Sequence, residues 1–258
     1  MDISAEAIAD LLNTKAAWYN KYWFIEDDPI CIPHRFSLKE DREIAGFLAA
    51  TIAWGQRPVI IRNATLLMQW MDFRPYDFIM NAGADEISYF DRFKHRTFNG
   101  EDCIYFIREL QRLYREEGGL EKIFTSGFNL NGGDAGLAIS SFRNHFFSSR
   151  APGRTHKHVS DPASGSAAKR INMFLRWMVR KDTNGVDFGL WDGIAPSQLC
   201  CPLDVHTASV ARQLGILRRN ANDWRSVMEL TTYLRTLDPA DPVKYDFALF
   251  GLGMYENF

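Results

Sequence analysis

The stretch that decides the fold is SDPASGSAAKRINMFLRWMVRK, residues 160–181. It opens with a tight turn around Gly165, and apolar residues then recur every three or four positions, which predicts a helix that starts near Ser166. On a helical wheel of about 100° per residue, the apolar side holds Ile171, Phe174, Leu175 and Met178. The opposite side, about 60° wide on this wheel, holds Lys169, Met173, Arg176 and Arg180. We therefore predict a helix with one face in the core and a narrow cationic stripe on the other.

The turn and the stripe together suit a polyanion. A turn whose backbone N–H groups are free, leading into a helix N-terminus, is a typical phosphate site. The expected contacts are Ser164, Gly165, Ser166, Arg170, Arg176 and Arg180. The charge distribution agrees, because residues 143–181 hold nine Lys or Arg and one acid, Asp161, in a chain of net charge −2. A solvated basic surface without a ligand is the alternative interpretation.

A second informative stretch is CCPLDVHTASVARQLGIL, residues 200–217. Its one carboxylate, Asp204, stands where a helix should begin, and Gly215 stands where it should end. The pattern leaves open whether Asp204 only caps the helix or is also a catalytic group held at a helix N-terminus. Asp241 followed by Pro242 predicts another capped helix start in the same way.

The remaining pattern is also helical. Three- and four-residue apolar spacing predicts helices at 3–20, 39–53, 58–72, 101–116, 167–181, 205–214, 223–236 and 242–252. Glycine-rich segments at 117–119 and 131–136 predict loops. Because alternating, strand-like runs are nearly absent, we predict an all-α protein. Residues 45–160 would form a middle lobe, and residues 1–44 plus 161–258 would form a second one.

Composition narrows the class of protein. The 258 residues are 46% apolar, which is enough to bury the core of one large domain or two small ones. No apolar run reaches the roughly 20 residues of a membrane span, and we expect no signal peptide because the first residues are acidic. The four cysteines lack metal-ligand spacing, so we expect free thiols, a cytoplasmic protein and no cofactor. His156 and His158 have no acidic or cysteine partner at a useful spacing for a metal.

Three segments resemble the helix-hairpin-helix DNA glycosylase superfamily. The turn at Gly165 and the helix that opens with Lys169 resemble the hairpin and its nucleophilic lysine, and GSAAKRINMFLRWMV is similar to a segment of the oxidised-guanine glycosylases. LDVHT, residues 203–207, resembles the V-D-T-H signature that carries the family's aspartate. FLAATIAWGQRPVIIRNAT, residues 47–65, resembles an early helix, loop and helix whose glutamine, here Gln56, enters the duplex.

The resemblance covers about residues 45–75 and 160–257. Lys169 lies four residues after Gly165 and 35 positions before Asp204, and both gaps are longer than in most members. No four-cysteine cluster follows, so no iron–sulfur centre is implied. The whole chain, including LRWMVR and the ending DPADPVKYDFALFGLG, is also similar to a bacterial family known only as a domain of unknown function.

The resemblance implies a two-lobed, glycosylase-like helical fold and a monomeric bacterial enzyme of base excision repair that acts on damaged double-stranded DNA. An oxidised purine such as oxoguanine would be flipped out of the duplex. Asp204 would stabilise the positive charge on the sugar, and neutral Lys169 would attack C1′ and permit strand cleavage as an AP lyase. His206 would pack beside or orient Asp204, while Gln56 and Arg57 would contact the duplex.

Two other functions stay open. A helix-hairpin-helix protein without chemistry would bind DNA or RNA through the same basic stripe and would need neither Lys169 nor Asp204. A metal-dependent hydrolase or nuclease would use Asp187, Asp192 and Asp204 together with histidines. We prefer the glycosylase because three separated segments match one superfamily in the right order.

Overall fold

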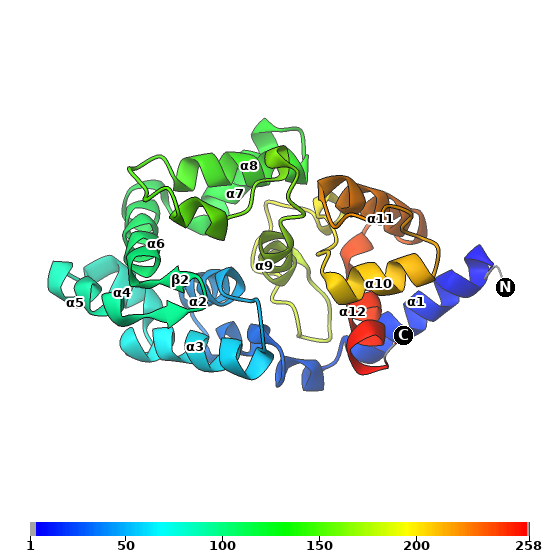
Figure 1. Cartoon of the computed structure of the whole chain (residues 1–258), viewed down its shortest axis with the longest axis horizontal. Helices are drawn as coiled ribbons and strands as arrows, with labels where there is room; N and C mark the ends of the chain where they lie inside the picture. The colour runs from blue at the N-terminus through cyan, green and yellow to red at the C-terminus, as the bar shows by residue number, and fades with distance from the viewer. Residues whose placement is uncertain (1–3, 257) are drawn as a thin grey trace. The chain divides into compact units, whose positions relative to one another are not determined.

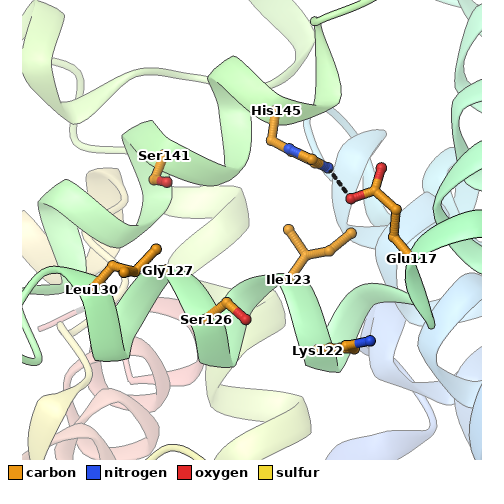
Figure 2. A pocket seen from close by; sticks show the side chains of 8 residues that line it. All are labelled: Glu117, Lys122, Ile123, Ser126, Gly127, Leu130, Ser141 and His145. Atoms are coloured by element: carbon orange, nitrogen blue, oxygen red, sulfur yellow. Dashed lines mark ion pairs between the residues drawn. The ribbon is translucent and has the colours of Figure 1, made fainter.

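A computed structural model describes residues 4–256 and 258. This part of the chain is predominantly helical, and its only strands, β1 (Lys94–His95) and β2 (Phe98–Asn99), pair antiparallel as a small hairpin (Figure 1). The predicted all-α fold class is therefore confirmed. Contacts within the chain define two units, which we describe one at a time.

Unit 1 comprises the described residues of 1–24, 134–136 and 161–258. Its α-helices are α1 (Ala5–Tyr19), α9 (Lys169–Val179), α10 (Val205–Gln213), α11 (Trp224–Leu237) and α12 (Tyr245–Tyr255). Short 3-10 helices lie at Tyr22–Ile25, Pro162–Ser164, Pro196–Gln198 and Pro242–Lys244. Each of these α-helices falls within three residues of a segment predicted from apolar spacing, because each buries an apolar face at helical periodicity.

Helix α12 contacts two other helices of unit 1, α1 and α10. It packs along α1 and against α10, and Figure 1 shows all three helices together. The contact with α1 is close because Gly251 faces the ring of Tyr19, and Tyr19 also stacks on Tyr255 with ring centroids 5.6 Å apart. Lys15 of α1 pairs with Glu256, just beyond α12, at 2.7 Å. The two ends of the chain are thereby joined inside this unit.

Unit 2 comprises residues 25–133 and 137–160. Its α-helices are α2 (Lys39–Thr51), α3 (Arg57–Trp70), α4 (Pro75–Asn81), α5 (Ala84–Ser88), α6 (Gly100–Arg112), α7 (Leu120–Leu130) and most of α8 (Ala135–Phe146). A π-helical turn follows α6 at Leu113–Glu117, and 3-10 helices lie at Pro29–Cys31, Pro33–Arg35, Tyr89–Arg92 and Thr155–His158.

Residues 25–44 pack within unit 2. The 3-10 helix at Pro29–Cys31 contacts α2 and α3, and the one at Pro33–Arg35 contacts α2. From the sequence, we predicted that these residues belong to one lobe with residues 161–258. The core of unit 2 is aromatic, since Phe47 lies 5.6–5.9 Å, centroid to centroid, from Phe106, Phe142 and Phe146. Such offset and edge-on ring contacts stabilise a core beyond the area that they bury.

The close approach of α12 to α1 predicts the effect of one methyl group. A Cβ at residue 251 would lie 2.2–2.5 Å from ring atoms of Tyr19, so Gly251→Ala should separate the two helices and lower the free energy of unfolding by about 1–3 kcal/mol. Urea denaturation measures this loss. Gly153→Ala is the control because a Cβ there has open space around it. Equal effects of the two substitutions would contradict the packing described here.

Candidate functional site

The turn that precedes α9 is held by its own backbone. The N–H groups of Ser164 and Ser166 both donate to the carbonyl of Asp161 at 3.2 Å, and Gly165 donates to Pro162 at 2.8 Å. Gly165 has φ +86°, a left-handed conformation that glycine adopts without strain. The sequence pattern predicted that these N–H groups are free for a phosphate, and that prediction is wrong. The turn closes on itself, and the hydroxyls of Ser164 and Ser166 also take part in local hydrogen bonds, with Asp161 and Ala168.

Helix α9 begins three residues later than predicted, at Lys169. Ser166 pairs with Asp223 in an isolated bridge, and its Oγ accepts the N–H of Ala168 at 3.2 Å, which keeps this part of the chain out of the helix. Ala168 itself has φ +44° and ψ +38°, a left-handed conformation that is strained for a residue with a Cβ. Backbone strain of this kind clusters at functional sites, and here it directly precedes Lys169.

Asp204 is the N-cap of α10, as predicted. Its Oδ1 accepts the backbone N–H groups of His206 and Thr207, each at 2.9 Å. These two bonds satisfy backbone N–H groups that have no partner inside the helix. The cap uses only one of the two carboxylate oxygens, so Oδ2 remains for another partner.

Lys169 provides that partner. Its Nζ lies 3.9 Å from Oδ2 of Asp204, and the two side chains are 29% and 17% exposed. The structure thus brings together two residues that lie 35 positions apart in the chain, each at the N-terminal end of a helix. An amine and a carboxylate held at this distance and open to solvent can act together on one reacting atom.

His206 supports this pair through its backbone. Its N–H donates to Asp204, whereas its imidazole packs edge-on against Phe250 of α12, 6.2 Å away between centroids. A Cβ at Gly253 of α12 would come within 3.0 Å of the Cβ of His206, so α10 and α12 approach closely here. The imidazole of His206 therefore packs on α12, and its backbone N–H is the group that contacts Asp204.

Arg176 and Arg180 do not form a solvent-facing stripe. Their side chains are each 4% exposed, and both are neutralised by carboxylates. Arg176 pairs with Asp187 at 3.2 Å and also with Asp246. Arg180 pairs with Asp182 at 2.7 Å, with Asp241 at 2.9 Å and with Asp187 at 3.2 Å. We call these six residues the arginine network.

The arginine network corrects two predictions. First, Arg176 and Arg180 are not available to bind DNA, because buried charges persist only when they are paired. Helix α9 is in fact buried on all sides from Ile171 to Val179. Second, Asp241 does not cap the helix that follows it, since its side chain makes no capping bond and accepts from Arg180 instead. A wheel drawn for one helix could not show carboxylates supplied by segments further along the chain.

Asp246 is a residue that the sequence analysis did not assign to the site. It is 6% exposed, and burial is the main cause that raises its pKa to about 6. Arg176 and Lys169 lower this pKa and Asp204 raises it. The pKa of Asp246 therefore depends on both residues of the Lys169–Asp204 pair. One signal was present in the sequence: Asp246 is the single charged residue of α12, YDFALFGLGMY.

The other predicted contact residues lie in two places. In unit 1, Ser164 and Gly165 are exposed and Ser166 is half-buried, while burial lowers the pKa of Arg170 to about 10. In unit 2, Gln56 is an exposed residue that precedes α3, where its carbonyl accepts the N–H groups of residues 59 and 60 at 3.0 Å. Arg57, the first residue of α3, is half-buried.

No group of three or more potential metal ligands occurs among the described residues. His158 bonds the buried Asp102 at 3.2 Å, and the ring of His156 stacks on Phe147 with centroids 4.3 Å apart. Asp187, which a metal-dependent nuclease would need, has both oxygens occupied by arginines. In the part of the chain that is described, no helix is both long and apolar enough to cross a membrane.

A comparison with known protein families identifies the family of this chain. The profile of a family described as protein of unknown function, DUF2400, covers residues 28–255. The chain belongs to the DUF2400 family. No curated protein and no solved structure matches it. Within this DUF2400 protein, the matched region contains the Lys169–Asp204 pair, the arginine network and the loop of Gln56.

The pKa of Asp246 predicts a pH dependence of stability for this DUF2400 protein. Folding raises this pKa from 3.8 to about 6, so the folded state holds the proton more tightly than the unfolded state. The resulting stabilisation is fully present below pH 3.8 and is lost as pH rises through 6. By linkage it amounts to about 3 kcal/mol. Asp246→Asn, which does not titrate, should remove this component of the pH profile.

The measurement is urea denaturation between these pH values for the wild type and Asp246→Asn. The control is Asp223→Asn, because a bond from Arg219 and the backbone of α11 lower the pKa of Asp223 to about 2. The stabilisation by Asp223 is present above pH 3.8 and is lost as pH falls from there through about 2, so its variant should parallel the wild type as pH rises through 6, where Asp246 titrates. A wild type and Asp246→Asn with parallel profiles would show that Asp246 titrates normally.

Proposed function

We propose that this protein is a DNA glycosylase with lyase activity that removes an oxidised purine, such as oxoguanine, from damaged double-stranded DNA. One observation carries the proposal: the amine of Lys169 lies 3.9 Å from the carboxylate of Asp204, at the start of two different helices and within reach of solvent. These two residue types at one site are what base excision through a covalent intermediate requires.

The carboxylate has a defined task. As the bond between C1′ and the base breaks, the sugar gains oxocarbenium character. A negative charge held in place beside C1′ stabilises that charge without reorganising, which is the main way in which a polar site lowers a barrier. Asp204 meets this requirement because two backbone N–H groups hold it, while its second oxygen faces Lys169.

The amine has a second task. Neutral Lys169 attacks C1′, the bond to the base breaks, and the base leaves with a proton. The bond from C1′ to the ring oxygen then opens, that oxygen takes up a proton, and a protonated imine joins Lys169 to C1′. Loss of a proton from C2′ expels the 3′ phosphate by β-elimination. The base must leave the duplex first for either residue to reach C1′.

The resemblance to helix-hairpin-helix glycosylases supports the proposal from a separate direction. It assigned the nucleophile to Lys169 and the carboxylate to Asp204 on sequence patterns alone, and these are the two residues that meet at 3.9 Å. The glycosylase-like fold is part of the proposal in the same way. The non-catalytic alternative relied on a basic stripe along α9, and the burial of Arg176 and Arg180 removes that support.

Two substitutions separate the two tasks. Asp204→Asn keeps the shape and the helix cap but removes the charge, so base release from an oxoguanine duplex should slow by about 100-fold or more. Lys169→Gln should abolish strand cleavage by β-elimination. Single-turnover assays with saturating enzyme measure both steps. Lys181→Gln, two residues after α9 and exposed, is the matched control and should behave as the wild type. Full activity in both site variants would refute the proposal.

A further inference from the structure

The hairpin of β1 and β2 in unit 2 presents cations on one face. Along β1 and into the turn, Lys94 and Arg96 are exposed, whereas His95 between them is 1% exposed. Strand geometry accounts for Lys94 and His95, because successive side chains on a strand point to opposite faces, whereas Arg96 lies beyond the strand in the turn. Arg96, at the turn, has φ +54°, a conformation that is uncommon for a residue with a side chain.

The buried side of the hairpin is anchored to the loop that contains Gln56. The two ring nitrogens of His95 bond the carbonyl of Trp54 at 3.1 Å and the amide of Asn63 at 2.9 Å. The turn is held as well, since Arg154 donates to the carbonyl of Thr97 at 2.8 Å. The cationic face of the hairpin and the loop before α3 therefore form one fixed surface within unit 2.

Arg96 lies directly over this loop. Gly55 has φ +105°, a conformation that favours glycine, and a Cβ there would come 2.7 Å from Nη1 of Arg96, so the guanidinium lies against this glycine. The exposed Gln56 is the next residue. Arg62 of α3 approaches the same place, because its Nε lies 3.4 Å from Oδ1 of Asn63, the residue that holds His95.

The two segments that form this surface contain no acid, and the exposed Glu101 that follows them lies 3.9 Å from Arg154. Residues 44–71 and 92–100 include neither Asp nor Glu. Among the residues that the structure describes, Arg62, Lys94 and Arg96 form no ion pair. Like charges at neighbouring positions destabilise a folded protein unless a ligand of opposite charge neutralises them. We name Gln56, Arg62, Lys94 and Arg96 the hairpin surface.

We infer that the hairpin surface binds the phosphates of duplex DNA. Lys94, on β1, and Arg96, in the turn that follows it, are two exposed cations on either side of the buried His95, so the pair can contact phosphates along one DNA strand. With Arg62 they would hold the backbone on either side of Gln56. The inference rests on the proposed function in taking duplex DNA as the ligand, but it involves neither Lys169 nor Asp204.

The salt dependence of binding to an undamaged, labelled duplex tests this assignment by fluorescence anisotropy. Each phosphate contact steepens the slope of log affinity against log salt by about 0.9. The double variant K94Q/R96Q should therefore flatten the slope by about two, and added R62Q by about one more. The control is R108Q/K122Q, which removes two exposed cations from α6 and α7 and should leave the slope nearly unchanged. Thermal melting confirms that every variant is folded.

The outcomes for the two proposals are distinct. A flatter slope only in K94Q/R96Q supports the hairpin surface, whether or not the wild type releases a damaged base. Base release by the wild type with an unchanged slope in K94Q/R96Q would overturn the hairpin surface and leave the proposed chemistry intact. The absence of any binding of the wild type to duplex DNA would overturn the inference as well.

Discussion

The structure of unit 1 depends on two arginines that are buried inside it. Arg176 lies in the last turn of α9 and Arg180 directly follows the helix, and both are almost inaccessible to solvent. Their charges can stay buried only because carboxylates from beyond α9 meet them. Asp182 and Asp187 come from the segment that follows α9, while Asp241 and Asp246 come from the start of the C-terminal helices. The arginine network thereby ties α9 to α12.

The candidate site lies at the N-terminal ends of α9 and α10. Lys169 opens α9 two turns before Arg176, and Asp204 opens α10, which packs on α12. A network that fixes α9 and α12 consequently fixes the distance between Lys169 and Asp204. Asp246 links the arginine network to the candidate site, because it pairs with Arg176 and because Lys169 and Asp204 both affect its pKa. The chemistry we propose needs this rigidity, because a charge stabilises a transition state only where it is held in place.

The sequence predicted those structural features that depend on residues close together in the chain. The apolar spacing of α1, α3 and α11, the cap of α10 by Asp204 and its end at Gly215 all follow from residues a few positions apart. The pairing of Lys169 with Asp204 was predicted only through resemblance to a family. Ion pairs between distant segments were not predictable, and they reversed the interpretation of Arg176, whose partner Asp246 lies 70 residues away. The hairpin surface was not predictable either, because it joins segments that are distant in the sequence: about 40 residues separate Gln56 from Arg96.

The measurement that tests the central claim most directly is borohydride reduction of the protein mixed with an oxoguanine duplex, followed by mass mapping of any cross-linked peptide. Borohydride converts the imine between an amine and C1′ into a stable bond, so the adduct records which residue attacked. Our account predicts a covalent adduct on Lys169. An adduct on another residue, or none with a duplex that the protein demonstrably binds, would contradict it and leave Asp204 as the N-cap of α10 alone.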